Sequence, residues 1–260
     1  MVNKMKSYEE IIGERRTLLK ALGVELEGWE SDQSKGAPPP PMEKPFSEDG
    51  ALYDLVSPED MSLGRIPLIE AIRRRQTRRR YTDDALTLEE LSFLLWSTQG
   101  VRSVDRDSGY TKRTVPSGGS RHPFETYLVV NRVEGIKNGI YRYLPIEHKL
   151  LLVAEGDPKL PDRLVAACDG QSFIGRAAVI FVWAAIPYRT EWSFGVLAYK
   201  DIVTDAGHIC QNLYLVCEAI GAGTCAVNGY NQAVMDALLG VDGEGEFTVY
   251  LASVGKVMKA

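Results

Sequence analysis

Residues 177–186, AAVIFVWAAI, constrain the fold of this chain more than any other segment, because all ten are apolar. A strand with one solvent-exposed face alternates apolar and polar residues, so an unbroken apolar run of this length indicates a strand that is covered on both faces. The run is also well short of the roughly 18 residues that a membrane-spanning helix requires. We therefore expect a central strand of a sheet with helices packed against it.

Other segments predict further strands and helices around that sheet. Residues 126–133 and 247–254 are rich in strand-forming residues, and residues 139–144 and 149–154 flank a short connection typical of a hairpin. Helices are expected over residues 66–72, with Pro67 in the first turn, after the capping box that begins at Thr87, and over residues 206–220, where apolar residues recur at helical spacing. The fold class is therefore α+β, with a central mixed sheet flanked by helices.

The first 45 residues differ in character from the rest. Residues 8–22 show an amphipathic helical pattern that ends at Gly23, and four consecutive prolines follow at positions 38–41. We expect residues 1–45 to be an extension packed over a neighbouring subunit or the mouth of a site, and residues 46–260 to form the main domain. Recognition of the proline run by another protein is the alternative.

The overall composition excludes several classes of function. The net charge of −5 argues against a general nucleic-acid binder, and the sequence contains no apolar run long enough for a membrane span and no signal peptide at its start, so a cytoplasmic location is expected. Four cysteines and three histidines show no metal-ligand spacing. We expect no metal site, and buried, reduced cysteines.

Two segments point to a bound phosphorylated cofactor. Residues 73–81, RRRQTRRRY, place six arginines in eight positions of an acidic protein, together with an amide and a hydroxyl that suit a phosphate and its polar chain. Residues 116–123, PSGGSRHP, form a loop whose glycines let the backbone approach a flat ligand. A solvated arginine face and an ordinary turn are the alternatives.

Taken in order with a third segment, residues 205–223, these two segments resemble the nitroreductase superfamily of FMN-dependent oxidoreductases, and most of all its SagB-type dehydrogenase branch. The resemblance covers about residues 65–257. It implies a nitroreductase-like fold and a homodimer with two FMN sites at the subunit interface. It also implies a small-molecule or peptide substrate, and NAD(P)H as a transient electron donor.

The resemblance also implies which residues contact the cofactor. It places Arg75, Gln76 and Thr77 at the FMN phosphate and ribityl chain and Arg79 near the pyrimidine edge of the ring, with threonine where the family usually has serine. The loop of Pro116, Ser117, Gly118 and Ser120 would come from the other subunit. The remaining expected contacts are Gln171, the Val227–Asn228–Gly229 backbone near flavin N5, and Lys256 at the phosphate.

Catalytic side chains are less well defined by the resemblance. Tyr199 and Lys200 lie where azoline-oxidising relatives carry a catalytic Lys/Tyr pair, and an exposed loop pair is the alternative. His208 is expected to be a packing or interface residue. The hypotheses are an FMN oxidoreductase fed by NAD(P)H, a SagB-like dehydrogenase of a peptide or small organic substrate, a flavin-binding protein without turnover, and a nucleic-acid binder that uses the arginines.

Overall fold

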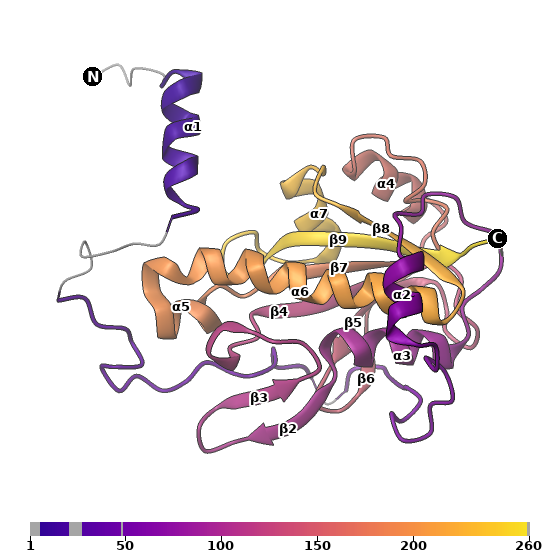
Figure 1. Cartoon of the computed structure of the whole chain (residues 1–260), viewed down its shortest axis with the longest axis horizontal. Helices are drawn as coiled ribbons and strands as arrows, with labels where there is room; N and C mark the ends of the chain where they lie inside the picture. Colours follow the sequence, from indigo (N-terminus) through magenta and orange to yellow (C-terminus); the bar gives the residue numbers. More distant parts are fainter. Residues whose placement is uncertain (1–5, 21–27, 48, 259–260) are drawn as a thin grey trace.

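A seven-stranded antiparallel sheet forms the centre of the molecule in a computed structural model, which describes residues 6–20, 28–47 and 49–258 (Figure 1). From one edge to the other the strands are β1 (Leu52–Asp54), β6 (Lys149–Glu155), β5 (Gly139–Leu144), β4 (Phe124–Val130), β7 (Val179–Ala185), β9 (Phe247–Lys256) and β8 (Ala222–Val227). The predicted α+β class and the 139–154 hairpin are confirmed.

The expectation of a mixed sheet is wrong in strand direction, since all six strand pairings are antiparallel. Parallel pairing among the described residues is limited to isolated bridges, Thr77 with Thr224 and Leu86 with Val133. The sheet lacks a parallel crossover unit because the long helices of this chain do not connect neighbouring parallel strands.

Strand β7 explains why the 177–186 run is so apolar. All seven of its residues are buried, and they alternate between two hydrophobic clusters on opposite faces of the sheet. Val179, Phe181 and Trp183 pack against α6 (Ala198–Ala219) and α3 (Leu88–Gln99), while Ile180 and Val182 pack toward α4 (Leu160–Ala167) and α7 (Gln232–Leu239). The predicted central, doubly covered strand is confirmed.

The predicted helices are present, with different boundaries. Helix α3 begins at the Thr87 capping box and ends at Gly100, as expected. Helix α2 (Leu68–Arg74) has Pro67 at its N-cap, one position before the predicted first turn. Helix α6 begins eight residues before the predicted start and crosses the sheet as the longest helix in Figure 1.

Several short elements were not predicted from the sequence. They are the hairpin of β2 (Val101–Asp105) and β3 (Tyr110–Arg113), helix α5 (Tyr188–Phe194), helices α4 and α7, edge strands β1 and β8, and two 3-10 turns over Gly118–Ser120 and Gly195–Leu197. Strand β4 ends at Val130 and not at residue 133, because the amides of Asn131 and Arg132 both turn to the carbonyl of Ala178.

The N-terminal extension has two parts with different packing. Helix α1 (Tyr8–Thr17) buries none of its residues, and residues 18–20 form a tight turn in place of the expected continuation, while the predicted stop at Gly23 lies outside the described residues. Residues 28–47 instead run along the core, where Ala37, Met42 and Lys44 accept hydrogen bonds from Trp192, Arg113 and Arg142. No helix in the described part of the chain is long and apolar enough to cross a membrane.

Candidate functional site

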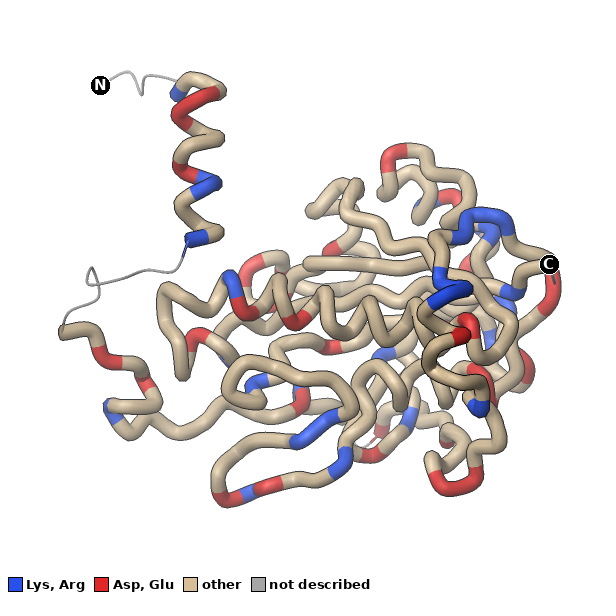
Figure 2. The backbone as a smooth tube through the Cα atoms, viewed as in Figure 1, with Lys and Arg blue, Asp and Glu red and all other residues tan. Residues whose placement is uncertain are grey.

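The arginine-rich segment leaves α2 and runs in extended conformation beside edge strand β8. Thr77 bridges Thr224 in parallel, and the Arg78 amide donates to the Thr224 carbonyl at 3.0 Å. The ring of Tyr81 ends the segment in the core, where its hydroxyl pairs with Ser253 at 2.7 Å. The segment is thereby fixed as a strand-like ribbon, and its basic residues gather at one end of the molecule near the C-terminus (Figure 2).

Three arginines of this segment have different neighbours. The guanidinium of Arg75 lies over the Tyr214 ring at 5.5 Å, and that of Arg79 lies over the Phe173 ring at 5.7 Å. Arg78 lies 3.7 Å from the Glu218 carboxylate. Within the described ranges, no carboxylate comes within 4 Å of Arg75 or Arg79, so their charges are available to an anion.

A hollow of about 340 Å³ opens between this segment and the end of β9. The residues that line it are Thr77, Arg78, Arg79, Arg80, Val257 and Met258. The Arg78 Nε is buried without a hydrogen-bond partner among the described residues. The three arginines that line the hollow favour an anionic or polar ligand there.

Tyr214 of α6 is a site residue that the sequence did not reveal. Its hydroxyl lies 3.2 Å from Thr77 Oγ1 and accepts from the Ala226 amide at 3.0 Å, and its ring supports Arg75. One side chain therefore sets the position of both residues that were expected at the phosphate and ribityl chain. In the sequence, the only indication of this role was that Tyr214 lies within residues 205–223, one of the segments that carry the resemblance.

Gln171 lies beside the residues after β8 that were expected to contact the cofactor. The Gln171 amide Nε2 donates to the Gly229 carbonyl at 3.2 Å and to the Cys168 carbonyl at 3.1 Å. Val227 is buried at the end of β8, whereas Asn228 and Gly229 are exposed. The nearest atoms to a methyl group at Gly229 would be 3.5 and 3.7 Å away, so this backbone is open to a ligand.

Arg79 lies close to Gln171 and Gly229 as well. Burial raises the pKa of the Cys225 thiol, and the nearby Arg79 guanidinium, which hydrogen-bonds with it, acts in the opposite direction. Since Phe173 follows Gln171 by two residues, Arg79, Gln171 and Gly229 belong to one region at the β8 edge. The four cysteines are all buried and free, as expected from the sequence.

Lys256 and Gln76 have different surroundings. The Lys256 ammonium pairs with the Glu90 carboxylate and donates to the Ile220 carbonyl at 3.0 Å, so it holds the C-terminal end of α6. Gln76 is exposed between Arg75 and Thr77. Lys256 is therefore near the arginine segment but already has two partners within the chain.

The glycine loop lies beside the N-terminal half of α6. Ser117 Oγ accepts from the His122 amide at 2.9 Å, and the Gly118 amide donates to Asp205 at 3.4 Å. Ser120 adopts a positive φ of 56°, a conformation that non-glycine residues seldom take. Pro116 precedes this anchored turn. Burial raises the pKa of Asp205, and the hydrogen bonds from Ser117 and Gly118 oppose that rise.

The loop and the arginine segment lie at different positions along α6. Asp205 contacts the loop and Tyr214 contacts Arg75 and Thr77, and their separation of nine positions corresponds to about 14 Å of helix. A single chain therefore does not bring Ser117 and Gly118 to Thr77. Asn228 lies beside the N-terminal half of α6, in a hollow of about 270 Å³ that it shares with Val203 and Gly207.

Tyr199 and Lys200 stand in the first turn of α6, and not in the exposed loop considered as an alternative. Tyr199 is half-buried and borders a cavity of about 500 Å³, whereas Lys200 is exposed. His208 is also partly exposed, 3.9 Å from Asp205. Among the described residues, no group of three or more histidine, cysteine or acidic side chains is arranged to hold a metal ion.

Comparisons with known proteins identify the family of this chain. Residues 72–256 match the sequence profile of the nitroreductase family. The chain belongs to the nitroreductase family. A nitroreductase-like protein of Methanocaldococcus jannaschii is 30% identical over 191 residues, which is 74% of this chain and 91% of the relative. The trifolitoxin-processing protein TfxB of Rhizobium leguminosarum bv. trifolii is 28% identical over 51% of this chain, but the match spans only 36% of TfxB.

Solved structures show the same fold. A nitroreductase-like protein of Ralstonia eutropha superposes with a TM-score of 0.66 at 24% identity, covering 86% of this chain and all of the other. One from Desulfovibrio desulfuricans, determined in complex with FMN, gives a TM-score of 0.52 at 17% identity over 75% of this chain and 89% of that chain. At these identities the likeness establishes the nitroreductase fold, and the family match indicates an oxidoreductase.

Proposed function

We propose that this chain is an FMN-dependent oxidoreductase that functions as a homodimer and accepts electrons from NAD(P)H. The observation that carries the proposal is the hollow at residues 77–80, which is lined by three arginines and in which no carboxylate lies within 4 Å of Arg79 among the described residues. The FMN bound by the Desulfovibrio protein is an aromatic ring with a phosphate tail, and the hollow suits that phosphate.

The residues present fit this cofactor. FMN, when bound, supplies reversible transfer of a hydride at its N5 atom. We assign Arg75 and Thr77, held by Tyr214, to the phosphate and ribityl chain, with Gln76 and Lys256 nearby. Lys256 would contribute its charge while still bound to Glu90.

The ring of the cofactor would lie toward the end of β8. We assign Arg79 to the pyrimidine edge, where a guanidinium offsets the negative charge that accompanies reduction. Gln171 would contact the same edge, and the exposed backbone of Asn228 and Gly229, next to Val227, would face N5. Thr77 contacts the C-terminal half of α6 through Tyr214, while Asn228 lies beside Val203 and Gly207 in its N-terminal half.

A second copy completes the site in this proposal. Because about 14 Å of α6 separates the glycine loop from the arginine segment, residues 116–120 of one chain lie away from Thr77, and a partner packed in the opposite direction along α6 would bring its own loop toward that segment. A homodimer with α6 near its two-fold axis satisfies that condition twice. Pro116, Ser117, Gly118 and Ser120 then belong to the partner's site.

The visible absorption spectrum of the purified protein tests the proposal, followed by anaerobic addition of NADH or NADPH. We expect a flavin spectrum that bleaches. Arg79→Met should weaken FMN binding by about ten-fold or more, since a charge-assisted contact contributes about 1.5–3 kcal/mol. Arg73→Met is the matched control, because Arg73 is exposed and pairs with Glu70 on α2. Absence of flavin even after FMN is added would refute the proposal.

A SagB-like dehydrogenase of a peptide or small organic substrate is the second candidate. The similarity to the trifolitoxin-processing protein TfxB favours it, as does the position of Tyr199 at the rim of the 500 Å³ cavity. Bound flavin would supply the hydride acceptor in that reaction, and Tyr199 or Lys200 would accept the proton that the substrate loses. A bound flavin that no nicotinamide bleaches, but that an organic donor does, would select this candidate.

A further inference from the structure

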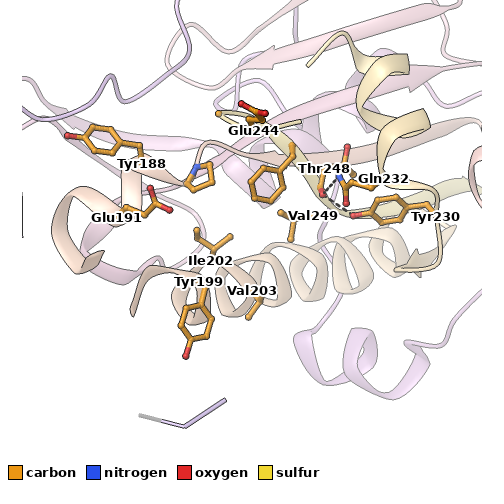
Figure 3. A pocket seen from close by; sticks show the side chains of 13 residues that line it. Tyr188, Glu191, Tyr199, Ile202, Val203, Tyr230, Gln232, Glu244, Thr248 and Val249 are labelled. Atoms are coloured by element: carbon orange, nitrogen blue, oxygen red, sulfur yellow. Dashed lines mark hydrogen bonds between the residues drawn. The ribbon is translucent and has the colours of Figure 1, made fainter. Parts of the chain in front are cut away.

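A cavity lies between α5, the start of α6 and the start of β9 (Figure 3). Its volume is about 500 Å³, which is within the range of small-molecule sites. Pro187, Ile202, Phe247 and Val249 give it apolar walls. A molecule that fills this space gains mainly from burial of apolar surface.

The polar groups on one wall are already paired within the chain. The Tyr230 hydroxyl and the Gln232 amide both donate to the Thr248 carbonyl at 3.0 Å, as drawn in Figure 3. Gln232 also donates to Asp236 at 2.8 Å. The hydrogen-bonding groups of this wall therefore do not require a strongly polar ligand.

The charged side chains that line the cavity are Glu191 and Glu244. They come from different elements, α5 and the loop before β9, and Figure 3 shows them on separate walls. Within the described ranges, neither carboxylate has a lysine, arginine or histidine nitrogen within 4 Å. Two unpaired negative charges around an apolar space produce a potential that attracts a cation and repels a phosphate.

The cavity adjoins the proposed flavin region. The 270 Å³ hollow that contains Asn228 shares Val203 and Val249 with the larger cavity. A molecule held between Glu191 and Glu244 would therefore point toward the Asn228 backbone.

We propose that the cavity between Glu191 and Glu244 binds the organic substrate, and that this substrate is an apolar or aromatic molecule with a positive charge. The inference rests on the proposed function for its link to hydride transfer, since that link requires flavin beside Asn228. The binding preference itself rests on the cavity and its two carboxylates. The substrate stacks against the apolar walls while its cationic group lies at the acidic rim.

Isothermal titration calorimetry of the full chain with three matched probes tests the preference. The probes are para-nitrobenzyltrimethylammonium, para-nitrobenzyl alcohol and para-nitrobenzoate, which share one ring and differ in charge. We expect the cation to bind about ten-fold or more tighter than the anion at low salt, with the difference shrinking as sodium chloride is added. In Glu191→Gln/Glu244→Gln the difference should fall to about two-fold or less.

Glu134→Gln/Glu155→Gln is the matched control, because it removes two exposed carboxylates elsewhere and should keep the preference. Equal binding of the three probes, binding of none, or an unchanged preference in Glu191→Gln/Glu244→Gln would overturn the inference. The visible spectrum of the same sample separates the two proposals. Flavin without a cation preference leaves the proposed function standing, and a cation preference without flavin leaves only the binding site.

Discussion

The Arg189 guanidinium donates to the Glu125 carboxylate across 2.6 Å, and both side chains are almost fully buried. The same carboxylate accepts from the Lys44 amide at 2.9 Å, and Arg142 donates to the Lys44 carbonyl at 2.9 Å. Arg189 also donates to the His122 carbonyl at 3.5 Å. The pair thus joins α5 and β4 to the N-terminal segment and to the end of the glycine loop.

Breaking that pair should strongly destabilise the fold. Arg189→Met leaves Glu125 as a buried charge without its closest partner, so we expect the free energy of unfolding to fall by about 3–5 kcal/mol in urea denaturation. Arg163→Met, which breaks an exposed pair with Asp157, should change it by only about 0–1 kcal/mol. Equal effects of the two substitutions would show that the Arg189–Glu125 pair does not stabilise the core.

The N-terminal extension should behave as two units on truncation. Removing residues 1–27 takes away α1, none of whose residues is buried, so the melting temperature should stay nearly unchanged. Removing residues 1–46 also deletes the carbonyls of Met42 and Lys44, which satisfy Arg113 and Arg142. We expect a large loss of stability, because buried donors without partners cost about 1–3 kcal/mol each.

Thermal unfolding of both truncations, with size-exclusion chromatography, measures these effects. A loss of stability or of dimer in the shorter truncation would support the expectation that residues 1–45 cover a neighbouring subunit. An unchanged melting temperature in the longer truncation would contradict the structural role of residues 42–46. Either result bears on whether the boundary at residue 45 separates the extension from the domain.

The sequence predicted those parts of the fold that depend on local pattern. The 177–186 run could only be satisfied by a strand covered on both sides, and the Thr87 capping box fixed the start of α3. Strand β8 has the sequence AGTCAV, with few strand-forming residues, and it forms because β9 pairs along its whole length. Strand β8 therefore depends on tertiary pairing, which the local strand propensity of its residues does not predict.

The same limit applies to the site. Arg75, Thr77 and Gln171 were expected from the resemblance, and the structure shows Gln171 bonded to Gly229, 58 positions away. Tyr214 and Phe173 were missed, since each becomes a site residue only through an arginine that stacks on it from a distant segment. No spacing rule in one sequence encodes such contacts.

Stability should depend on pH through Glu43. Burial, followed by a hydrogen bond with Glu147, raises the pKa of Glu43 from 4.5 to about 8. Below pH 4.5 both states hold the proton, and between 4.5 and about 8 the unfolded state releases it first, so stability falls as the pH rises. Above about 8 this penalty is constant.

Glu43→Gln, which mimics the protonated acid, should therefore remove that part of the decline. The difference in the free energy of unfolding between the variant and the parent should grow across the window by no more than about 1.4 kcal/mol per pH unit. Urea titrations at several pH values measure it, with Glu134→Gln as an exposed control. A constant difference between variant and parent across the window would contradict the raised pKa.

The apolar face of α2 provides the sharpest test of the proposed dimer. Leu68, Ile69 and Ile72 are 65%, 53% and 54% exposed, and α2 lies beside α6 in Figure 1. Three neighbouring aliphatic side chains in water favour burial against a partner. We expect Ile72→Glu to elute as a monomer in size-exclusion chromatography, with little change in folding because the side chain is exposed in the single chain.

The same variant should also lose flavin, because a monomer lacks the partner's Ser117–Ser120 loop. Val153→Glu is the matched control. Val153 is 42% exposed and lies on β6, away from α2. It should remain dimeric and keep its flavin spectrum. A dimeric, flavin-loaded Ile72→Glu would place the interface on another surface, whereas a monomer that keeps flavin would show that one chain completes the site alone.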